Sequence, residues 1–144
     1  MDKSKPILVT GATGYIASWI IERLLNQGYS VHATVRDPSK KNKIQHLYDL
    51  ADKSSGQIQF YQADLLEPNS FDEAMQGCEI VIHTASPFVV TNYKDAVKDI
   101  IEPAVKGTEN VLDSVNRTES VKRVVLTSSI ASTYGDAVEI QNTA

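Results

Sequence analysis

The chain has 144 residues, of which 42% are hydrophobic and 22% charged, a length and composition that suit one globular domain covering residues 1–144. Its formal net charge of −4 argues against nucleic acid as the main partner, because a phosphate backbone is bound by a basic surface. A single cysteine and the lack of zinc-ligand spacing argue against a disulfide or metal site, and without a long apolar run we expect a cytoplasmic protein that binds no membrane.

The stretch at residues 7–19, ILVTGATGYIASW, predicts a buried strand, a glycine turn and a helix in immediate succession. Its first three residues are the short apolar run of a strand buried on both faces. Gly11 and Gly14 bracket the turn, and later apolar residues recur at helical spacing. This arrangement places free backbone N–H groups and the positive end of a helix dipole at one point. We interpret that point as a site for the pyrophosphate of a dinucleotide.

Four further strands and three further helices are expected to alternate along the rest of the chain. Apolar patterns bounded by turn residues indicate strands at residues 30–35, 57–61, 79–83 and 121–127. Apolar residues at helical intervals indicate helices at residues 40–52, 71–76 and 93–115. The buried centre of the last strand is expected to be Val124, Val125 and Leu126.

Local signals refine these boundaries. Gly28 is placed to end the first helix in a left-handed conformation, and Ser70 and Glu73 have the spacing of a capping box at the start of the third helix. Pro103 predicts a kink or a restart near Glu102 in the last helix. Three residues outside the turns are expected to be packed, and these are Trp19, Cys78 and His83.

The order βαβαβαβαβ, with mostly apolar strands, predicts an α/β protein with a doubly wound parallel sheet of the Rossmann type. We expect about five strands in the order 3-2-1-4-5, which is an incomplete sheet of this kind. Ligands of such sheets bind at the carboxyl ends of the strands, where the strand order reverses between the first and fourth.

Several segments together resemble one family. They are the motif TGxxGxxA at residues 10–17, Arg36 after the second strand, HTASP at residues 83–87 and RVVLTSS at residues 123–129. On these segments the chain is similar to the extended short-chain dehydrogenase/reductases, and in particular to their dihydroflavonol 4-reductase and cinnamoyl-CoA reductase branch. The resemblance spans nearly the whole chain.

The glycine turn has a physical task in cofactor binding. Gly11 permits the tight turn, and Gly14 lets the backbone approach the phosphates. Thr13, Tyr15 and Ile16 are expected to contribute to the same cofactor site, with the side chains of the last two packed against the protein. A purely structural turn is the alternative interpretation.

Arg36 favours NADP as the cofactor. A cation after the second strand accommodates the 2′-phosphate of NADP, whereas an acidic residue there would bind the ribose hydroxyls of NAD. Lys43 adds a second positive charge nearby in the sequence, and Asp37 keeps NAD open as the minority interpretation. A solvated surface arginine is the remaining alternative.

The resemblance implies further cofactor contacts at the ends of the other strands. Asp64 and Leu65 match the pair that contacts adenine, although an aspartate in a loop is more commonly a turn or cap residue. The loops after the fourth and fifth strands would line the ribose, pyrophosphate and nicotinamide through Thr84, Ala85, Ser86, Thr127 and Ser128.

Ser129 is the catalytic residue that the resemblance implies, as the hydrogen-bond partner of a substrate carbonyl, with Ser128 and Ser132 as less well matched alternatives. The family's proton donor is a tyrosine followed four positions later by a lysine. The chain contains no such pair, because Val138 stands four positions after Tyr134. Since family members are about twice as long, the chain resembles their amino-terminal portion, and we expect it to be inactive alone.

The resulting prediction is the cofactor-binding portion of a reductase that transfers hydride from NADPH to a small-molecule ketone or aldehyde. Two alternatives stay open: a dinucleotide-binding module without activity, and a sugar-nucleotide epimerase or dehydratase of the same superfamily. The fifth strand would present an unpaired edge and exposed apolar surface, so we expect the chain to associate or to be poorly soluble. The sequence leaves the oligomeric state open.

Overall fold

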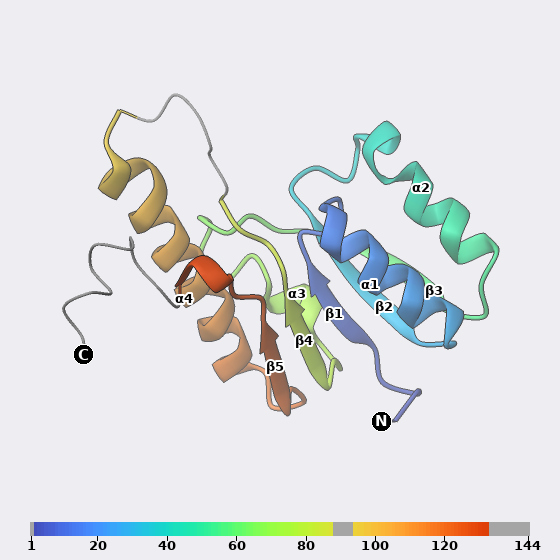
Figure 1. Cartoon of the computed structure of the whole chain (residues 1–144). Helices are drawn as coiled ribbons and strands as arrows, with labels where there is room; N and C mark the ends of the chain where they lie inside the picture. The colour runs from blue at the N-terminus through green and yellow to red at the C-terminus, as the bar shows by residue number, and fades with distance from the viewer. Residues whose placement is uncertain (1, 88–93, 133–144) are drawn as a thin grey trace, which may run out of the picture.

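A computed structural model describes residues 2–87 and 94–132 of the chain. Its centre is one five-stranded sheet in the order β3-β2-β1-β4-β5 (Figure 1). Every neighbouring pair is parallel. The strands are β1 Ile7–Thr10, β2 Ser30–Val35, β3 Gln57–Gln62, β4 Ile80–His83 and β5 Arg123–Leu126. The predicted fold class and strand order are therefore confirmed.

Helices cover both faces of the sheet (Figure 1). On one face lie α1 Tyr15–Asn26 and α2 Lys41–Asp52, and on the other lie α3 Asp72–Met75 and α4 Glu102–Arg117. A π-helical turn, η1 Val97–Ile101, leads into α4, and a 3-10 turn, η2 Ile130–Ser132, follows β5. No helix within the described ranges is long and apolar enough to cross a membrane.

The central strand β1 supplies side chains to two separate cores. Ile7 and Val9 pack with α1 and α2, whereas Leu8 packs with α3 and α4. All residues of β1 are buried, as the continuous apolar run predicts for a strand covered on both faces. His83 and Cys78 are buried as well, which confirms that they are packed. Burial raises the pKa of the Cys78 thiol to about 12, so this group behaves as a small apolar side chain.

The capping box predicted from Ser70 and Glu73 is wrong. The third helix begins at Asp72, and its N-cap position is Phe71, which makes no side-chain cap hydrogen bond. Ser70 instead serves the loop before it, because its hydroxyl donates to the carbonyl of Asp64 at 2.7 Å and accepts from the amide of Asp64 at 3.2 Å. The S-x-x-E spacing therefore predicted the start of the helix to within about two residues, but it predicted the wrong hydrogen-bond partner for Ser70.

The break predicted near Glu102 is confirmed. Residues Val97–Ile101 form a π-helical turn, and a regular α-helix begins at Glu102 with Pro103 in its first turn. Proline has no N–H to donate and its ring crowds the carbonyl four residues earlier, so a widened turn before it relieves both conflicts. Residue 93, where the sequence predicts the start of this helix, lies outside the described residues. Gly28 ends α1 with φ of +80°, as expected.

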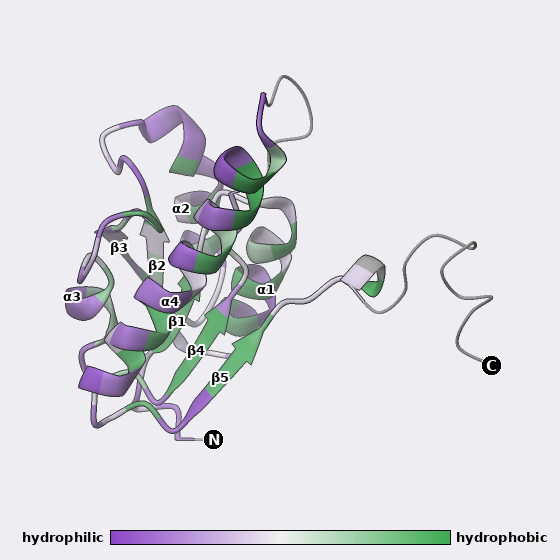
Figure 2. Ribbon diagram, turned by 90° about the vertical axis from the view of Figure 1, so that its left-hand side faces the viewer, coloured by the Kyte–Doolittle hydropathy of each residue, from purple (hydrophilic) through white to green (hydrophobic). Residues whose placement is uncertain are grey.

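Burial was overestimated at β5 and on the outer side of α1. Val125 and Leu126 point to opposite faces of the edge strand β5 and are 47% and 54% exposed, because the described helices leave both residues partly uncovered. Tyr15, Ile16 and Trp19 are 80%, 55% and 59% exposed, since α1 buries the side that carries Ala17 and Ile21. In Figure 2 the ribbons of β4 and β5 are coloured mostly green, which marks hydrophobic residues. The predicted exposure of apolar surface at this edge is confirmed.

Candidate dinucleotide-binding site

The turn between β1 and α1 is built around Gly11. Its φ of +67° lies in the left-handed region, and a Cβ at this position would lie 3.0 Å from both Cα and Cβ of Ala85. The amide of Gly11 donates to Oγ1 of Thr34 at 3.3 Å, which ties the turn to β2. Glycine is therefore required here both by the backbone conformation and by the close approach of the loop after β4.

The N-terminus of α1 is open to an anion. Thr13, Gly14, Tyr15 and Ile16 are all exposed, Gly14 at the N-cap position offers no side chain to cap the helix, and the first turn contains no acidic residue. The positive end of the helix dipole and the first amides are thus not neutralised by the helix itself. This is the local geometry that binds a phosphate group.

Thr10 joins this turn to the loop after β4. Its hydroxyl accepts the amides of Thr84 and Ala85 at 3.2 and 3.1 Å. A third bond runs from the hydroxyl of Thr84 to the carbonyl of Thr10 at 2.6 Å. In the sequence Thr10 stands within the glycine motif, with no role predicted for it. Its buried position directly before a glycine turn was the signal available.

His83 completes this buried network. Its Nδ1 lies 2.7 Å from the Thr10 hydroxyl. Because the hydroxyl already accepts two amides, its own proton points to Nδ1, which assigns a neutral ring with its proton on Nε2. Burial lowers the pKa of His83, which agrees with the neutral form. The sequence predicted His83 as a packed residue, and the structure adds its contact with the turn.

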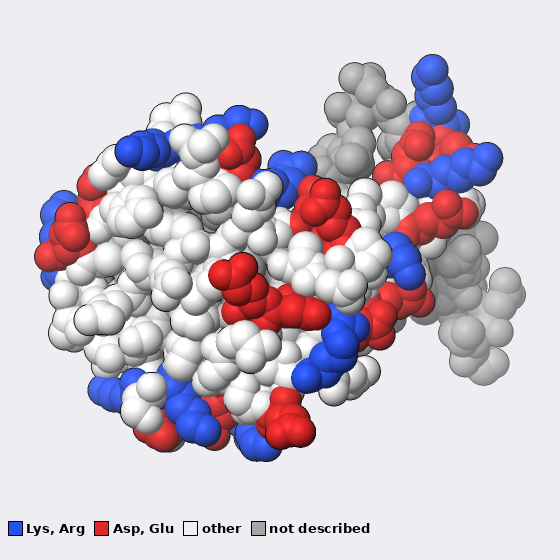
Figure 3. Space-filling model, turned by 180° about the vertical axis from the view of Figure 1, so that it is seen from behind, with Lys and Arg blue, Asp and Glu red and all other residues white. Residues whose placement is uncertain are grey.

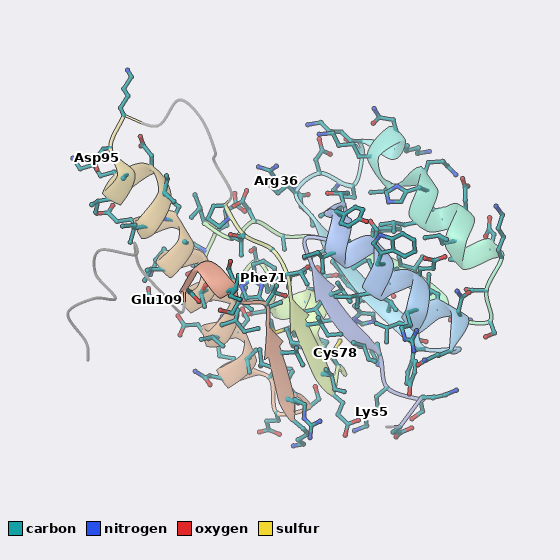
Figure 4. All side chains as sticks on the ribbon, in the orientation of Figure 1. Lys5, Arg36, Phe71, Cys78, Asp95 and Glu109 are labelled. Atoms are coloured by element: carbon teal, nitrogen blue, oxygen red, sulfur yellow. The ribbon has the colours of Figure 1, made fainter. Side chains whose placement is uncertain are left out.

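Arg36 follows β2 on the same edge of the sheet as the N-terminus of α1 (Figure 4). Its side chain is exposed, and none of the ion pairs among the described residues involves it. Asp37 has local partners, because its carboxylate accepts the hydroxyl and the amide of Ser39 at 2.6 and 3.0 Å. These bonds lower the pKa of Asp37. The cation is therefore available to a ligand, whereas the neighbouring carboxylate is engaged within its own loop.

The loop after β3 lies beside the end of β2, since the amide of Ala63 donates to the carbonyl of Val35 at 3.0 Å. Asp64 and Leu65 are half-buried in this loop. One carboxylate oxygen of Asp64 accepts the amide of Leu66 at 2.9 Å, so part of this side chain has the turn role that was its alternative interpretation. Lys43 is exposed in the first turn of α2, and no described contact joins it to these loops.

The segment after β5 reaches the same edge. The amide of Thr127 donates to the carbonyl of His83 at 3.0 Å, and Thr127, Ser128 and Ser129 are exposed. The two alternatives to Ser129 bond to one another, with the hydroxyls of Ser128 and Ser132 3.1 Å apart. The hydroxyl of Ser132 also bonds the Ser129 carbonyl at 2.6 Å. Tyr134 and Val138 lie outside the described residues.

The predicted residues thus follow the ends of all five strands at one edge of the sheet, with Ser86 exposed beside Ala85. Direct contacts join the turn after β1 to the loop after β4, and the end of β2 to the loop after β3. Two surface hollows, one lined by Ser30 and Gln57 and the other by Lys122, lie at the opposite edge, so they are separate from this site.

The rear face of the molecule carries charges of both signs. Figure 3 shows acidic and basic side chains interspersed over the described residues of the rear face. Among the described residues, no group of three His, Cys, Asp or Glu side chains is arranged to hold a metal ion. The local geometry that stands out is the uncapped helix N-terminus beside the glycine turn.

Comparison with known proteins gives consistent matches. The profile of the family described as "NAD dependent epimerase/dehydratase family" matches residues 7–144. Cinnamoyl-CoA reductase CAD2 of Medicago truncatula is 53% identical over 125 residues, which cover 87% of this chain and 38% of that protein. Dihydroflavonol 4-reductase of Solanum lycopersicum is 43% identical over 127 residues, 88% of this chain and 33% of that protein.

A solved structure agrees with the same fold. Gre2 of Candida albicans, in complex with NADPH, matches with a TM-score of 0.75 and 32% identity, over 92% of this chain and 40% of that one. The chain therefore spans well under half the length of these relatives. The resemblance to the dihydroflavonol 4-reductase and cinnamoyl-CoA reductase branch is confirmed by the relatives themselves.

Proposed function

We propose that this chain, which belongs to the NAD dependent epimerase/dehydratase family, forms the NADPH-binding part of a reductase that acts on a ketone or aldehyde. One observation carries the proposal: the uncapped N-terminus of α1, the Gly11 turn and the exposed Arg36 lie at one edge of the sheet. The similarity to reductases, one of them solved with NADPH, supports the same proposal.

The described residues would bind a dinucleotide in a defined order along the edge of the sheet. The amides at the start of α1 would hold the pyrophosphate, and the absence of a side chain at Gly11 lets the loop after β4 approach this point. Arg36 would bind the 2′-phosphate of the adenosine half, beside Asp64 and Leu65. The other half would extend toward Thr84, Thr127 and Ser129 at the ends of β4 and β5.

When bound, NADPH supplies the hydride. Ser129 would orient the substrate carbonyl by a hydrogen bond. This bond would become stronger as negative charge grows on the carbonyl oxygen. The printed sequence offers no tyrosine and lysine at the spacing that would supply the proton. We therefore propose that these 144 residues bind the cofactor and contribute to carbonyl positioning, but do not complete a reduction alone.

A sugar-nucleotide epimerase or dehydratase is the second candidate, favoured by the description of the matching family. The similarity to reductases over most of this chain favours the first candidate.

The proposed cofactor preference is tested by replacing the cation. Arg36→Ala should weaken NADPH binding on the order of tenfold, because it removes a charge-assisted partner of the 2′-phosphate, and should leave NADH binding nearly unchanged. Isothermal titration of the chain with both cofactors measures this. Arg23→Ala, which removes an exposed arginine in the last turn of α1, is the matched control. Equal losses for both cofactors would contradict the preference for NADP.

A further inference from the structure

Asn110 is a buried polar residue that no motif in the sequence marks. It lies in α4 and is 3% exposed. Its Nδ2 donates to the carbonyl of Leu65 at 2.7 Å, across 45 residues of sequence. A buried side-chain amide is costly unless it is hydrogen-bonded, and asparagine is a poor helix former. An apolar residue would stabilise the helix more at this position, so the hydrogen bond to the Leu65 carbonyl is what asparagine contributes here.

Gly107 lies one turn earlier on the same side of α4. It is buried, and a Cβ there would lie 3.0 Å from Cβ of Leu65. Glycine destabilises a helix interior, so Gly107, like Asn110, is unfavourable for α4 itself. Its missing side chain leaves room for the loop after β3. Glu109 marks this turn of α4 in Figure 4. Two positions of the helix, one polar and one without a side chain, thus accommodate the same loop residue.

The loop is also held from its other side. The hydroxyl of Ser70 bonds both the amide and the carbonyl of Asp64, and the Asp64 carboxylate accepts the amide of Leu66. Ser70 and Asp64 fix the shape of the loop, because these bonds are local. Asn110 fixes its position relative to the sheet, because it reaches the loop from a helix that packs on the sheet's face.

We propose that Asn110, together with Gly107, is a positioning residue for the adenosine half of the cofactor. Asn110 holds the Leu65 carbonyl, and this sets where Asp64 and Leu65 stand relative to Arg36 at the end of the neighbouring strand. The inference rests on the proposed function, since it assigns a task to Asp64 and Leu65 in binding the adenosine moiety. The relevant ligand chemistry is an adenosine carrying a 2′-phosphate.

The test uses the chain as it stands, titrated with adenosine 2′,5′-bisphosphate and with NADPH. Asn110→Leu keeps the side-chain size but cannot donate to Leu65, and should raise the Kd of both ligands about tenfold. Thr118→Val is the matched control, because it removes a buried hydrogen bond at the C-terminal end of α4, 2.8 Å from the Thr118 hydroxyl to the Ser114 carbonyl. It should lower the melting temperature while leaving both Kd values unchanged.

Gly107→Ala separates positioning from stability. Alanine favours the helix, yet its methyl group displaces Leu65, so the Kd of the bisphosphate should rise about threefold without a matching fall in thermal stability. Unchanged Kd values in Asn110→Leu would overturn the inference but not the proposed function. An equal rise of the Kd values in Asn110→Leu and Thr118→Val would have the same meaning. Failure of the unaltered chain to bind either ligand would overturn the proposed function, and the inference with it.

Discussion

Gly11 is required for two reasons, its left-handed backbone conformation and its close approach to Ala85, and substitutions can separate the two. Gly11 and Gly77 both have positive φ, but a Cβ at Gly77 would meet nothing within 4 Å, whereas at Gly11 it would meet Ala85. Gly77→Ala should cost about 1 kcal/mol of unfolding free energy, the price of a left-handed alanine. Gly11→Ala should cost more, and should also weaken NADPH binding. Chemical denaturation and titration of both variants measure this. Equal stability losses, with cofactor binding intact, would contradict the role of the close approach.

His83 predicts a pH dependence of stability. Burial depresses its pKa in the folded state, so its stabilising contribution is complete above the ordinary value of 6.5 and is lost as the pH falls below it. His83→Gln should therefore reduce the difference in unfolding free energy between pH 7.5 and pH 5.5, conditions chosen to bracket about 6.5. The exposed His46 provides the control, since His46→Gln leaves His83 in place. An undiminished pH dependence in His83→Gln would contradict the assignment.

At the level of elements, a bidentate ion pair joins α3 to α4. Arg117 contacts the two carboxylate oxygens of Asp72 at 2.7 and 3.2 Å, and this pairing lowers the pKa of Asp72. Because both side chains are partly exposed, Asp72→Asn should cost only about 0.5–1 kcal/mol at pH 7. The depressed pKa means that this contribution is lost as the pH falls through the folded value, below the ordinary 3.8.

A second ion pair, between Lys106 and Glu109 of α4, supplies the control for the stability loss in Asp72→Asn. Lys106 and Glu109 are more exposed and lie three residues apart on one helix, so Glu109→Gln should change stability by no more than about 0.5 kcal/mol. Urea denaturation at neutral and acidic pH compares the two. If Asp72→Asn lowers the unfolding free energy no more than Glu109→Gln does, the ion pair between α3 and α4 does not contribute to stability.

Element types were predictable because each has a local cause. The apolar run of β1, the alternation in β2 and Pro103 before a regular helix all act over a few residues. The capping box failed because Ser70 bonds a loop residue six positions earlier, an interaction that the S-x-x-E spacing does not contain. The exposure of Trp19 also escaped prediction, since helical periodicity gives the spacing of apolar residues but not which side meets the sheet.

For the whole molecule, the exposed apolar residues of the edge strand β5 predict association. Val125 and Leu126 present apolar surface on an edge strand, which favours pairing with another copy. Val125→Lys should lower the weight-average mass in sedimentation at micromolar concentration. Gln59→Lys, at an exposed position of the opposite edge strand β3, is the control and should leave it unchanged. A monodisperse monomer for the unaltered chain would contradict the prediction.

The candidate site was predictable as a set of loops but not as a set of contacts. Parallel topology places the ends of β1, β2 and β4 on one edge, so Gly11, Arg36 and Thr84 could be assigned to one region. The contacts of Thr10 and Asn110 depend on pairs more than forty residues apart. The place of Thr10 before the glycine turn marks that residue but not its partners, and nothing local marks Asn110. The free amides at the start of α1 were predicted from the succession of strand, glycine turn and helix, and the structure places Gly14 at the N-cap with no capping side chain.

The central claim is that the carboxyl edge of this sheet binds NADPH through the glycine turn and Arg36. Isothermal titration of the unaltered chain with NADPH, and in parallel with NADH, tests it most directly. The account predicts saturable binding of NADPH at one site, at least about tenfold tighter than that of NADH, because only NADPH carries the 2′-phosphate. Equal affinity for the two cofactors, tighter NADH binding, or no binding of either would contradict it.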